Sequence, residues 1–246
     1  MRYLILSDIH ANFEALDAVL ADAQGAYDRI VCCGDLVGYG ADPNAICDWA
    51  RANLHVVVRG NHDKACARSA GAEYFNPPAQ ASAAWTRAAL SPENLAYTCA
   101  LPQGPAEIVG ARLVHGSPID EDEYVLSERE AARAASRLGE GIYFFGHSHL
   151  QGGFLGDWKG VRPLPRPNPS AAERTLALDP GRLYLINPGA VGQPRDGDPR
   201  AAYAVYRPEE RVVHLRRASY DIERAQAKIR DAGLPPSLAE RLAAGR

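Results

Sequence analysis

The chain has 246 residues, of which 46% are hydrophobic and 23% are charged, with a formal net charge of −3. This ordinary soluble composition suits one large α/β domain or two small ones. The weak negative charge excludes a general attraction to nucleic acid or to anionic membranes, so any phosphate binding must be local.

Cysteine usage and hydropathy bear on the cellular compartment. The five cysteines form an odd set without a C-x-x-C spacing, and adjacent Cys32 and Cys33 point to opposite faces if they lie on a strand, so they do not readily bridge. The apolar run at the N-terminus is too short for a signal peptide, and no run reaches the roughly 20 residues of a membrane span. We therefore expect a cytoplasmic protein with reduced, buried cysteines and no membrane partner.

The first sixty residues alternate between strand-like and helical patterns. Apolar runs at residues 3–6, 30–33 and 55–58 predict strands, and the segments 12–25 and 42–53 between them predict helices. Asn12 and Asp42 are the expected N-caps, and Pro43 suits the first helical position. This order predicts parallel βαβ units.

The rest of the chain contains further helices and more strands. Residues 78–96 predict two helices, residues 106–116 a hairpin turning at Gly110 and Ala111, residues 127–138 a helix, and residues 142–145 a strand. Prolines at alternate positions predict an extended loop at residues 162–170, and three strand-like segments precede a helical C-terminus. We expect one α/β domain over residues 1–246, with a motif-bearing core at 1–220, a helical extension at 221–246, and two sheets packed together and covered by helices.

Five of the apolar runs end in a short polar cluster. Five of the seven histidines fall in these clusters, which read SDIH (7–10), GDLVG (34–38), GNHD (60–63), HGS (115–117) and GHSH (146–149). Each cluster alone is explained as well or better by a simple turn. Five unrelated turns, however, have no reason to share His, Asp and Asn, and ligands bind where strand-end loops of α/β sheets converge.

The clusters supply carboxylate, amide and imidazole ligands without thiolates. This mixture suits divalent Mn, Fe, Zn, Co or Ni, and seven ligands suit two ions sharing a bridging carboxylate. Two such ions can clamp a phosphoryl group and activate a bridging water. The predicted ligands are Asp8, His10, Asp35, Asn61, His115, His147 and His149.

In this order the clusters resemble the calcineurin-like metallophosphoesterase superfamily, whose pattern is D-x-H, G-D-x-x-[DG], G-N-H-[DE], a later histidine and G-H-x-H. The resemblance covers residues 4–149 and implies a four-layer α/β/β/α sandwich. It further implies that a metal-bridging hydroxide attacks the phosphate while His62 assists the leaving group. The implied ligands are Asp8, His10 and His149 for one metal, Asn61, His115 and His147 for the other, and Asp35 as the bridge.

A looser resemblance extends to small bacterial phosphodiesterases and diadenosine-tetraphosphatase-like proteins. Gly38 stands where protein phosphatases of the superfamily carry an aspartate that orients the catalytic histidine, so the residue that orients His62 is open, with Asp63 a candidate. This departure favours a phosphodiester, a nucleotide or a dinucleoside polyphosphate over a phosphoprotein. The alternatives are a non-catalytic scaffold and a nuclease, and the lack of a basic surface disfavours the nuclease.

Further residues have two interpretations each. Arg59 either contacts substrate phosphate or points to water, and Asn12 either binds phosphate or caps its helix. Tyr39 and Phe75 either stack on a nucleobase or pack within the protein, and residues 187–200 either line the site or form a surface turn. The oligomeric state is not indicated by the sequence.

Overall fold

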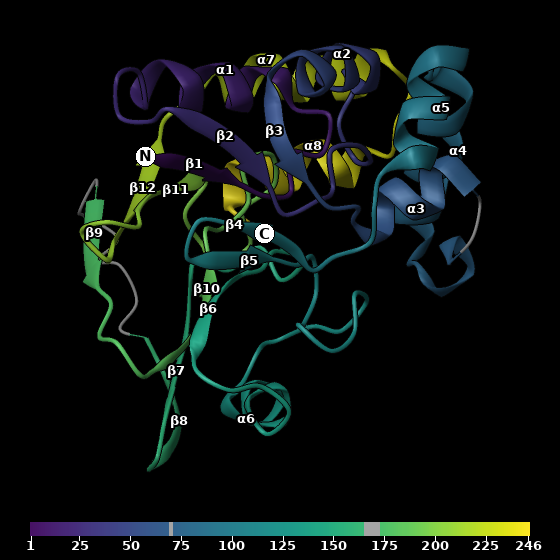
Figure 1. Cartoon of the computed structure of the whole chain (residues 1–246). Helices are drawn as coiled ribbons and strands as arrows, with labels where there is room; N and C mark the ends of the chain where they lie inside the picture. The colour runs from purple at the N-terminus through teal and green to yellow at the C-terminus, as the bar shows by residue number, and fades with distance from the viewer. Residues whose placement is uncertain (69–70, 165–172) are drawn as a thin grey trace.

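The computed structural model describes residues 1–68, 71–164 and 173–246, which form two six-stranded sheets flanked by helices (Figure 1). The first sheet has parallel β1, β2 and β3 on one side and antiparallel β11, β12 and β9 on the other. Its strand order is β3(Leu54–Val57), β2(Arg29–Cys32), β1(Tyr3–Leu6), β11(Ala201–Arg207), β12(Val212–Ala218) and β9(Glu173–Ala177).

The second sheet is also mixed. Strands β5, β6 and β10 are parallel, and β4, β7 and β8 run antiparallel to their neighbours. The order is β4(Ala106–Ile108), β5(Ala111–Leu113), β6(Gly141–Phe144), β10(Leu183–Asn187), β7(Gly152–Asp157) and β8(Gly160–Pro163).

Helices cover the outer faces of both sheets, which gives the four-layer α/β/β/α sandwich (Figure 1). On the first sheet and beside it lie α1(Phe13–Asp22), α2(Pro43–Asn53), α3(Asn61–Arg68), α4(Pro77–Ala89), α5(Pro92–Ala100), α7(Ile222–Asp231) and α8(Pro236–Ala244), with a 3₁₀ turn at Ala72–Tyr74. The second sheet is covered by α6(Glu128–Ala135), which Ser127 and Glu130 open with a capping box.

Strand β1 shows how the layers are joined. All four of its side chains are buried, Leu4 and Leu6 against the helices and Tyr3 and Ile5 in the core between the sheets. Alternate side chains of a strand face opposite sides, so a continuous apolar run suits a strand covered on both faces. The fold class and the early βαβ units are therefore as predicted.

Local differences from the sequence-based expectations have physical causes. Asp42 occupies the predicted N-cap position of α2, but its side chain forms no capping hydrogen bond, because the carboxylate accepts from Lys228 Nζ at 2.8 Å instead. The hairpin turns at Val109 and Gly110, one residue earlier than expected, since Ile108 pairs with Ala111. The predicted loop at residues 162–170 falls mostly outside the described residues, and its first two residues complete β8.

Three strands and one helix were not predicted. Strand β7 is rich in glycine, and β8 and β9 are short and largely exposed, so none of them shows a strong apolar pattern. The GNHD cluster opens α3 rather than forming an isolated turn. None of the helices in the described part of the chain is long and apolar enough to cross a membrane.

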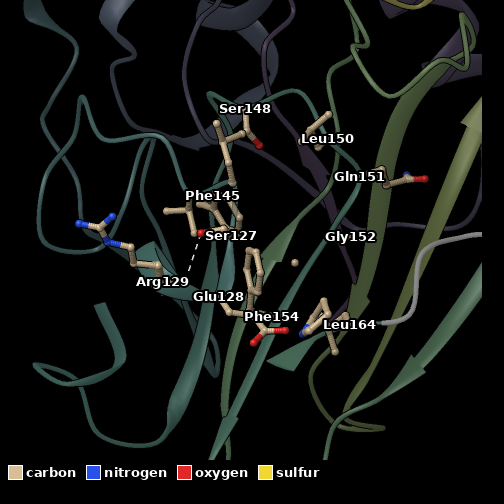
Figure 2. A pocket seen from close by; sticks show the side chains of 14 residues that line it. Ser127, Glu128, Arg129, Phe145, Ser148, Leu150, Gln151, Gly152, Phe154 and Leu164 are labelled. Atoms are coloured by element: carbon tan, nitrogen blue, oxygen red, sulfur yellow. Dashed lines mark hydrogen bonds between the residues drawn. The ribbon is translucent and has the colours of Figure 1, made fainter. Parts of the chain in front are cut away.

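A cavity of about 420 Å³ lies between the start of α6 and the β7–β8 hairpin (Figure 2). Phe145, Phe154 and Leu164 supply apolar lining, and Ser127 and Glu128 supply polar lining. The cavity adjoins the GHSH loop through Ser148, but none of the predicted metal ligands lines it.

Candidate metal centre

The five polar clusters meet at one edge of the molecule. They follow β1, β2 and β3 of the first sheet and β5 and β6 of the second, and the strands are parallel within each group. Parallel strands end at the same edge of a sheet, which is where ligand sites of α/β folds lie. The predicted ligands are thereby brought together from distant positions of the chain, such as His10 and His149, which are 139 residues apart.

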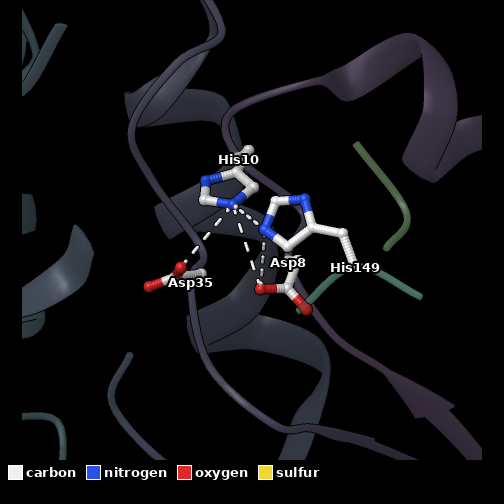
Figure 3. A group of neighbouring side chains, drawn as sticks. All are labelled: Asp8, His10, Asp35 and His149. Carbon is white, nitrogen blue, oxygen red and sulfur yellow. Dashed lines mark hydrogen bonds and ion pairs between the residues drawn. The ribbon is translucent and has the colours of Figure 1, made fainter. Parts of the chain in front are cut away.

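The first ligand group contains Asp8, His10, Asp35 and His149 (Figure 3). One potential ligand atom of each lies within 4.8 Å of the others, and all four residues are buried. His149 Nε2 lies 3.2 Å from Asp8 Oδ1, and His10 Nε2 lies 3.6 Å from Asp35 Oδ2.

The second ligand group contains Asp35, His115 and His147. His115 Nε2 lies 3.4 Å from Asp35 Oδ2 and 3.0 Å from Asn61 Oδ1, so the Asn61 amide oxygen faces the same point. Asp35 belongs to both groups. This sharing is the geometry that a bridging carboxylate requires.

The hydrogen bonds behind the ligands orient them for a cation. His10 Nδ1, His115 Nδ1 and His149 Nδ1 lie 3.1, 2.8 and 2.5 Å from the carbonyl oxygens of Val37, Cys33 and Gln193. A carbonyl only accepts, so each Nδ1 carries a proton and donates it, and in the neutral form of each ring Nε2 presents a lone pair to the cluster. Asp35 Oδ2 is buried with no hydrogen-bond partner. Unpaired acceptors facing one another fit bound metal ions.

Burial controls the charge of the histidines. It lowers the pKa of His147 to about 3 and that of His10 well below its usual range, so both are neutral near pH 7, as metal ligands must be. His115 differs: burial lowers its pKa, but Asp35 and Asp8 outweigh burial and raise it to about 10. A position that retains a proton beside two carboxylates is also favourable for a metal cation.

Backbone conformation aims the ligands inward. Asp8, His10, Asp35, His147 and His149 all have φ between 49° and 65°, in the left-handed region that non-glycine residues rarely adopt. Close approach of the loops adds a second constraint, because a Cβ on Gly146 would lie 1.9 Å from Ser7 Oγ. Such strained backbone conformations persist only where many contacts of the surrounding structure hold them in place.

His62 lies beside the ligands. Its ring packs between Tyr39 and Phe75, with centroids 4.3 and 4.4 Å away, and meets the edge of His10 at 5.0 Å. Burial lowers the pKa of His62 to about 4. Tyr39 and Phe75 thus pack on an imidazole.

No carboxylate among the described residues orients the His62 ring. Its Nδ1 is buried without a hydrogen-bond partner. A side chain at position 38 would clash with the ring, since a Cβ on Gly38 would lie 2.7 Å from that nitrogen. The Asp63 carboxylate instead accepts hydrogen bonds from the backbone N–H groups of Asp35, Val37 and Gly60. Asp63 therefore holds the loop that carries Asp35, and aromatic packing holds His62.

The two residues suggested for phosphate contact have partners within the protein. Arg59 Nε and Nη2 donate to the Glu121 carboxylate at 2.9 and 2.8 Å. Asn12 caps α1 by accepting from Ala15 N–H and donates to the carbonyl of Gly192. Their contact with substrate stays a prediction.

The segment 187–200 lies against the metal ligands. Asn187 Nδ2 donates to Gly146 O and Ser148 Oγ, both at 2.9 Å, and the carbonyl of Gln193 accepts from His149. The Ser148 hydroxyl therefore forms a hydrogen bond with Asn187, next to the predicted metal ligands His147 and His149.

Three aromatic or basic residues near the centre escaped sequence analysis. Tyr124 stacks on His147 with centroids 3.8 Å apart, and Arg195 and Arg241 lie over the Tyr39 ring. Arg195 lies in the turn-rich segment 187–200, for which the sequence allows a position lining the site. Nothing in the local pattern around Tyr124 or Arg241 distinguishes them from surface residues.

Comparison with known proteins is consistent with this geometry. The chain is 35% identical to an uncharacterized protein of Methanocaldococcus jannaschii, over 98% of this chain and 97% of that protein. A metallophosphoesterase of Sphaerobacter thermophilus shares 41% identity and a TM-score of 0.87, covering 100% and 99% of the two chains. A hypothetical protein of Pyrococcus horikoshii shares the fold at 19% identity, with a TM-score of 0.78 over 100% and 98%. Residues 1–211 match the calcineurin-like phosphoesterase superfamily domain, so the chain belongs to this superfamily of hydrolases that act on phosphoesters.

Proposed function

We propose that the protein is a dinuclear metal-dependent phosphoesterase whose substrate is a phosphodiester or a nucleotide-type compound. The observation that carries the proposal is the sharing of Asp35 between two buried ligand groups. Asp8, His10 and His149 would hold one ion with Asp35, and Asn61, His115 and His147 would hold the other. The ligand types suit Mn, Fe, Zn, Co or Ni.

The metal ions and His62 have different roles in the proposed reaction. When bound, two divalent ions supply Lewis acidity toward phosphoryl oxygens and lower the pKa of water. His62 is buried next to His10 and, with its pKa lowered to about 4, is a neutral imidazole near pH 7. Its N–H group donates a hydrogen bond to the leaving-group oxygen and so stabilises the charge that develops there.

The substrate class is supported by what surrounds His62. Gly38 supplies no carboxylate to the imidazole, and burial lowers the pKa of His62 to about 4 although the charge of Asp35 acts in the opposite direction, so little of the protonated form is present near pH 7 to act as a general acid. Leaving groups that are already stable as anions, such as phosphate chains, need the least proton donation. The same geometry makes phosphoprotein monoesters with alkoxide leaving groups poor substrates.

We extend the proposal to a cytoplasmic location. Support comes from the cysteines, since all five are free and four of them are buried. Reducing compartments preserve such thiols.

A substrate screen tests the proposal. Purified protein supplemented with Mn²⁺ should hydrolyse bis(p-nitrophenyl) phosphate or a dinucleoside polyphosphate faster than p-nitrophenyl phosphate. Failure to hydrolyse any of the three with any of the five metals would contradict the proposal. Fewer than one bound ion per chain would then indicate a scaffold, and DNA cleavage that falls steeply with salt would indicate a nuclease.

A further inference from the structure

Two arginines from distant parts of the chain lie over one aromatic ring at the metal centre. The guanidinium carbon of Arg195 is 5.7 Å from the Tyr39 ring centroid, and that of Arg241, on α8, is 5.9 Å away. The same ring lies 4.3 Å from the His62 ring and 4.6 Å from the His10 ring. The Tyr39 ring therefore lies near both guanidinium groups, near the catalytic candidate and near a metal ligand.

Neither arginine forms an ion pair with an aspartate or glutamate side chain among the described residues. Arg195 Nη2 donates only to neutral acceptors, Tyr39 Oη at 3.3 Å and Gln193 Oε1 at 3.1 Å, and its Nε is buried with no hydrogen-bond partner. Arg241 Nε donates to a main-chain oxygen of Arg246, the last residue of the sequence, at 2.6 Å. By contrast, Arg59 is paired with Glu121 beside the same centre.

Two neighbouring guanidinium groups without an aspartate or glutamate partner repel each other, and a bound anion relieves this repulsion. Burial and the positive charge of Arg195 together lower the pKa of Arg241. The repulsion between the two positive charges raises the free energy of the protein without a ligand. Binding of a negative group near both arginines removes this repulsion and is therefore favourable.

We propose that Arg195 and Arg241 bind a second phosphate of the substrate, linked to the phosphate that is hydrolysed. The inference rests on the proposed function, because a second phosphate site requires that the first phosphate of the substrate binds at the metals. Guanidinium groups present planar pairs of N–H donors that match phosphate oxygens, and the Nε donor of Arg195 has no hydrogen-bond partner within the protein.

The position of the arginines assigns the second phosphate to the leaving group. They lie on the side of Tyr39 and His62, where the proposed function places the leaving-group oxygen. The substrate class is then a phosphoric anhydride, such as a dinucleoside polyphosphate. A P–O bond to water oxygen forms, the bridging P–O bond breaks, the departing phosphate keeps the bond's electron pair, and a proton of the water passes to solvent.

Binding of two inorganic probes tests the inference. The Mn²⁺-supplemented full chain is titrated calorimetrically with inorganic phosphate and with methylenediphosphonate, which carries two linked phosphoryl groups and is not hydrolysed. Arg195→Ala and Arg241→Ala should each raise the Kd of methylenediphosphonate about tenfold, the loss typical of charge-assisted hydrogen bonds. The Kd of phosphate should change less than about threefold, because a single phosphate is held at the metals.

Matched variants control for charge and for folding. Arg230→Ala removes one positive charge from an exposed position on α7 and should leave both Kd values unchanged. Arg195→Lys keeps the charge but loses the planar donor pair, so its diphosphonate Kd should be intermediate. It also serves as the second variant if Arg195→Ala does not fold.

The outcomes separate the inference from the proposed function. Equal weakening of both probes, or no weakening beyond that of Arg230→Ala, would overturn the second-phosphate site even if phosphoesters are hydrolysed. Selective loss of diphosphonate binding in a protein that hydrolyses no phosphoester would uphold the arginine site and overturn the proposed function.

Discussion

The Nε2 atoms of His10 and His149 lie 3.1 Å apart in a buried position. Both rings donate their Nδ1 protons to backbone carbonyls, so two lone pairs face each other. This contact is unfavourable between neutral imidazoles and becomes favourable when a cation lies between them. The short distance between these two nitrogen atoms therefore predicts how substitution of either histidine changes the number of bound metal ions.

Replacing His149 by Asn should reduce the metal content from about two ions per chain to about one. The remaining ion is retained because the second group, Asp35, His115 and His147, does not include His149. Elemental analysis by mass spectrometry after metal supplementation measures the change. His214→Ala is the control, since His214 pairs with Glu173 on β9 away from the centre. Two ions in the His149 variant would contradict this assignment.

Replacing His62 by Asn should lower kcat by roughly 10²–10⁴-fold with metal content unchanged. The reason is that the His62 ring contacts His10, Tyr39 and Phe75 but belongs to neither ligand group. Steady-state kinetics and metal analysis on the same preparation give both values. A parallel loss of metal would show instead that His62 is a ligand.

Gly38→Ala should lower kcat much more than Gly25→Ala. Both glycines have positive φ, 91° and 75°, so both variants are strained by about 1 kcal/mol. Only at Gly38 does the new Cβ meet His62 Nδ1, at 2.7 Å, whereas nothing lies within 4 Å of the Gly25 position. Thermal unfolding measures the shared destabilisation, and kinetics measures the displacement of the imidazole. Equal kcat values would argue against a role for the exact position of the ring.

The native protein should expose at most one reactive thiol at pH 8. Burial raises the pKa of Cys47 to about 12 and that of Cys32, Cys33 and Cys66 well above the usual range. A raised pKa keeps the thiol protonated at pH 8, and the thiolate is the reactive form. Cys99 is only partly buried.

Titration with Ellman's reagent measures the reactive thiols. The folded chain should give one equivalent or less, and the chain in guanidinium chloride should give all five, because unfolding exposes the buried thiols. Fast reaction of several native thiols would contradict the burial of these side chains.

The strand ends were predictable because two signals coincide in the sequence. Continuous apolar runs such as Tyr3–Leu6 mark strands buried on both faces, and the polar residues that follow them mark one shared edge. The structure brings Asp8, Asp35 and the predicted histidines together on this basis. Their roles as ligands, and the single-domain organisation over 1–246, stay predictions.

Features that depend on distant partners could not be read from the sequence. Asp42 is used by Lys228, 186 positions away, rather than by its own helix. Asp63 is adjacent to His62 in the chain, yet the helical start at Asn61 turns its carboxylate toward the backbone of the Asp35 loop. Arg241 reaches Tyr39 only through the docking of α8, which no local pattern encodes.

The order of strands in the sheets has a consequence for biosynthesis. The strand β1 that carries Asp8 pairs with β11, and the strand β6 that precedes His149 pairs with β10, so both are held by segments that the ribosome makes late. A nascent chain that already contains all seven predicted ligands still lacks the strands that align them. We therefore expect ion choice to be made by the completed protein in exchange with the metal pool of the cell, and not during translation.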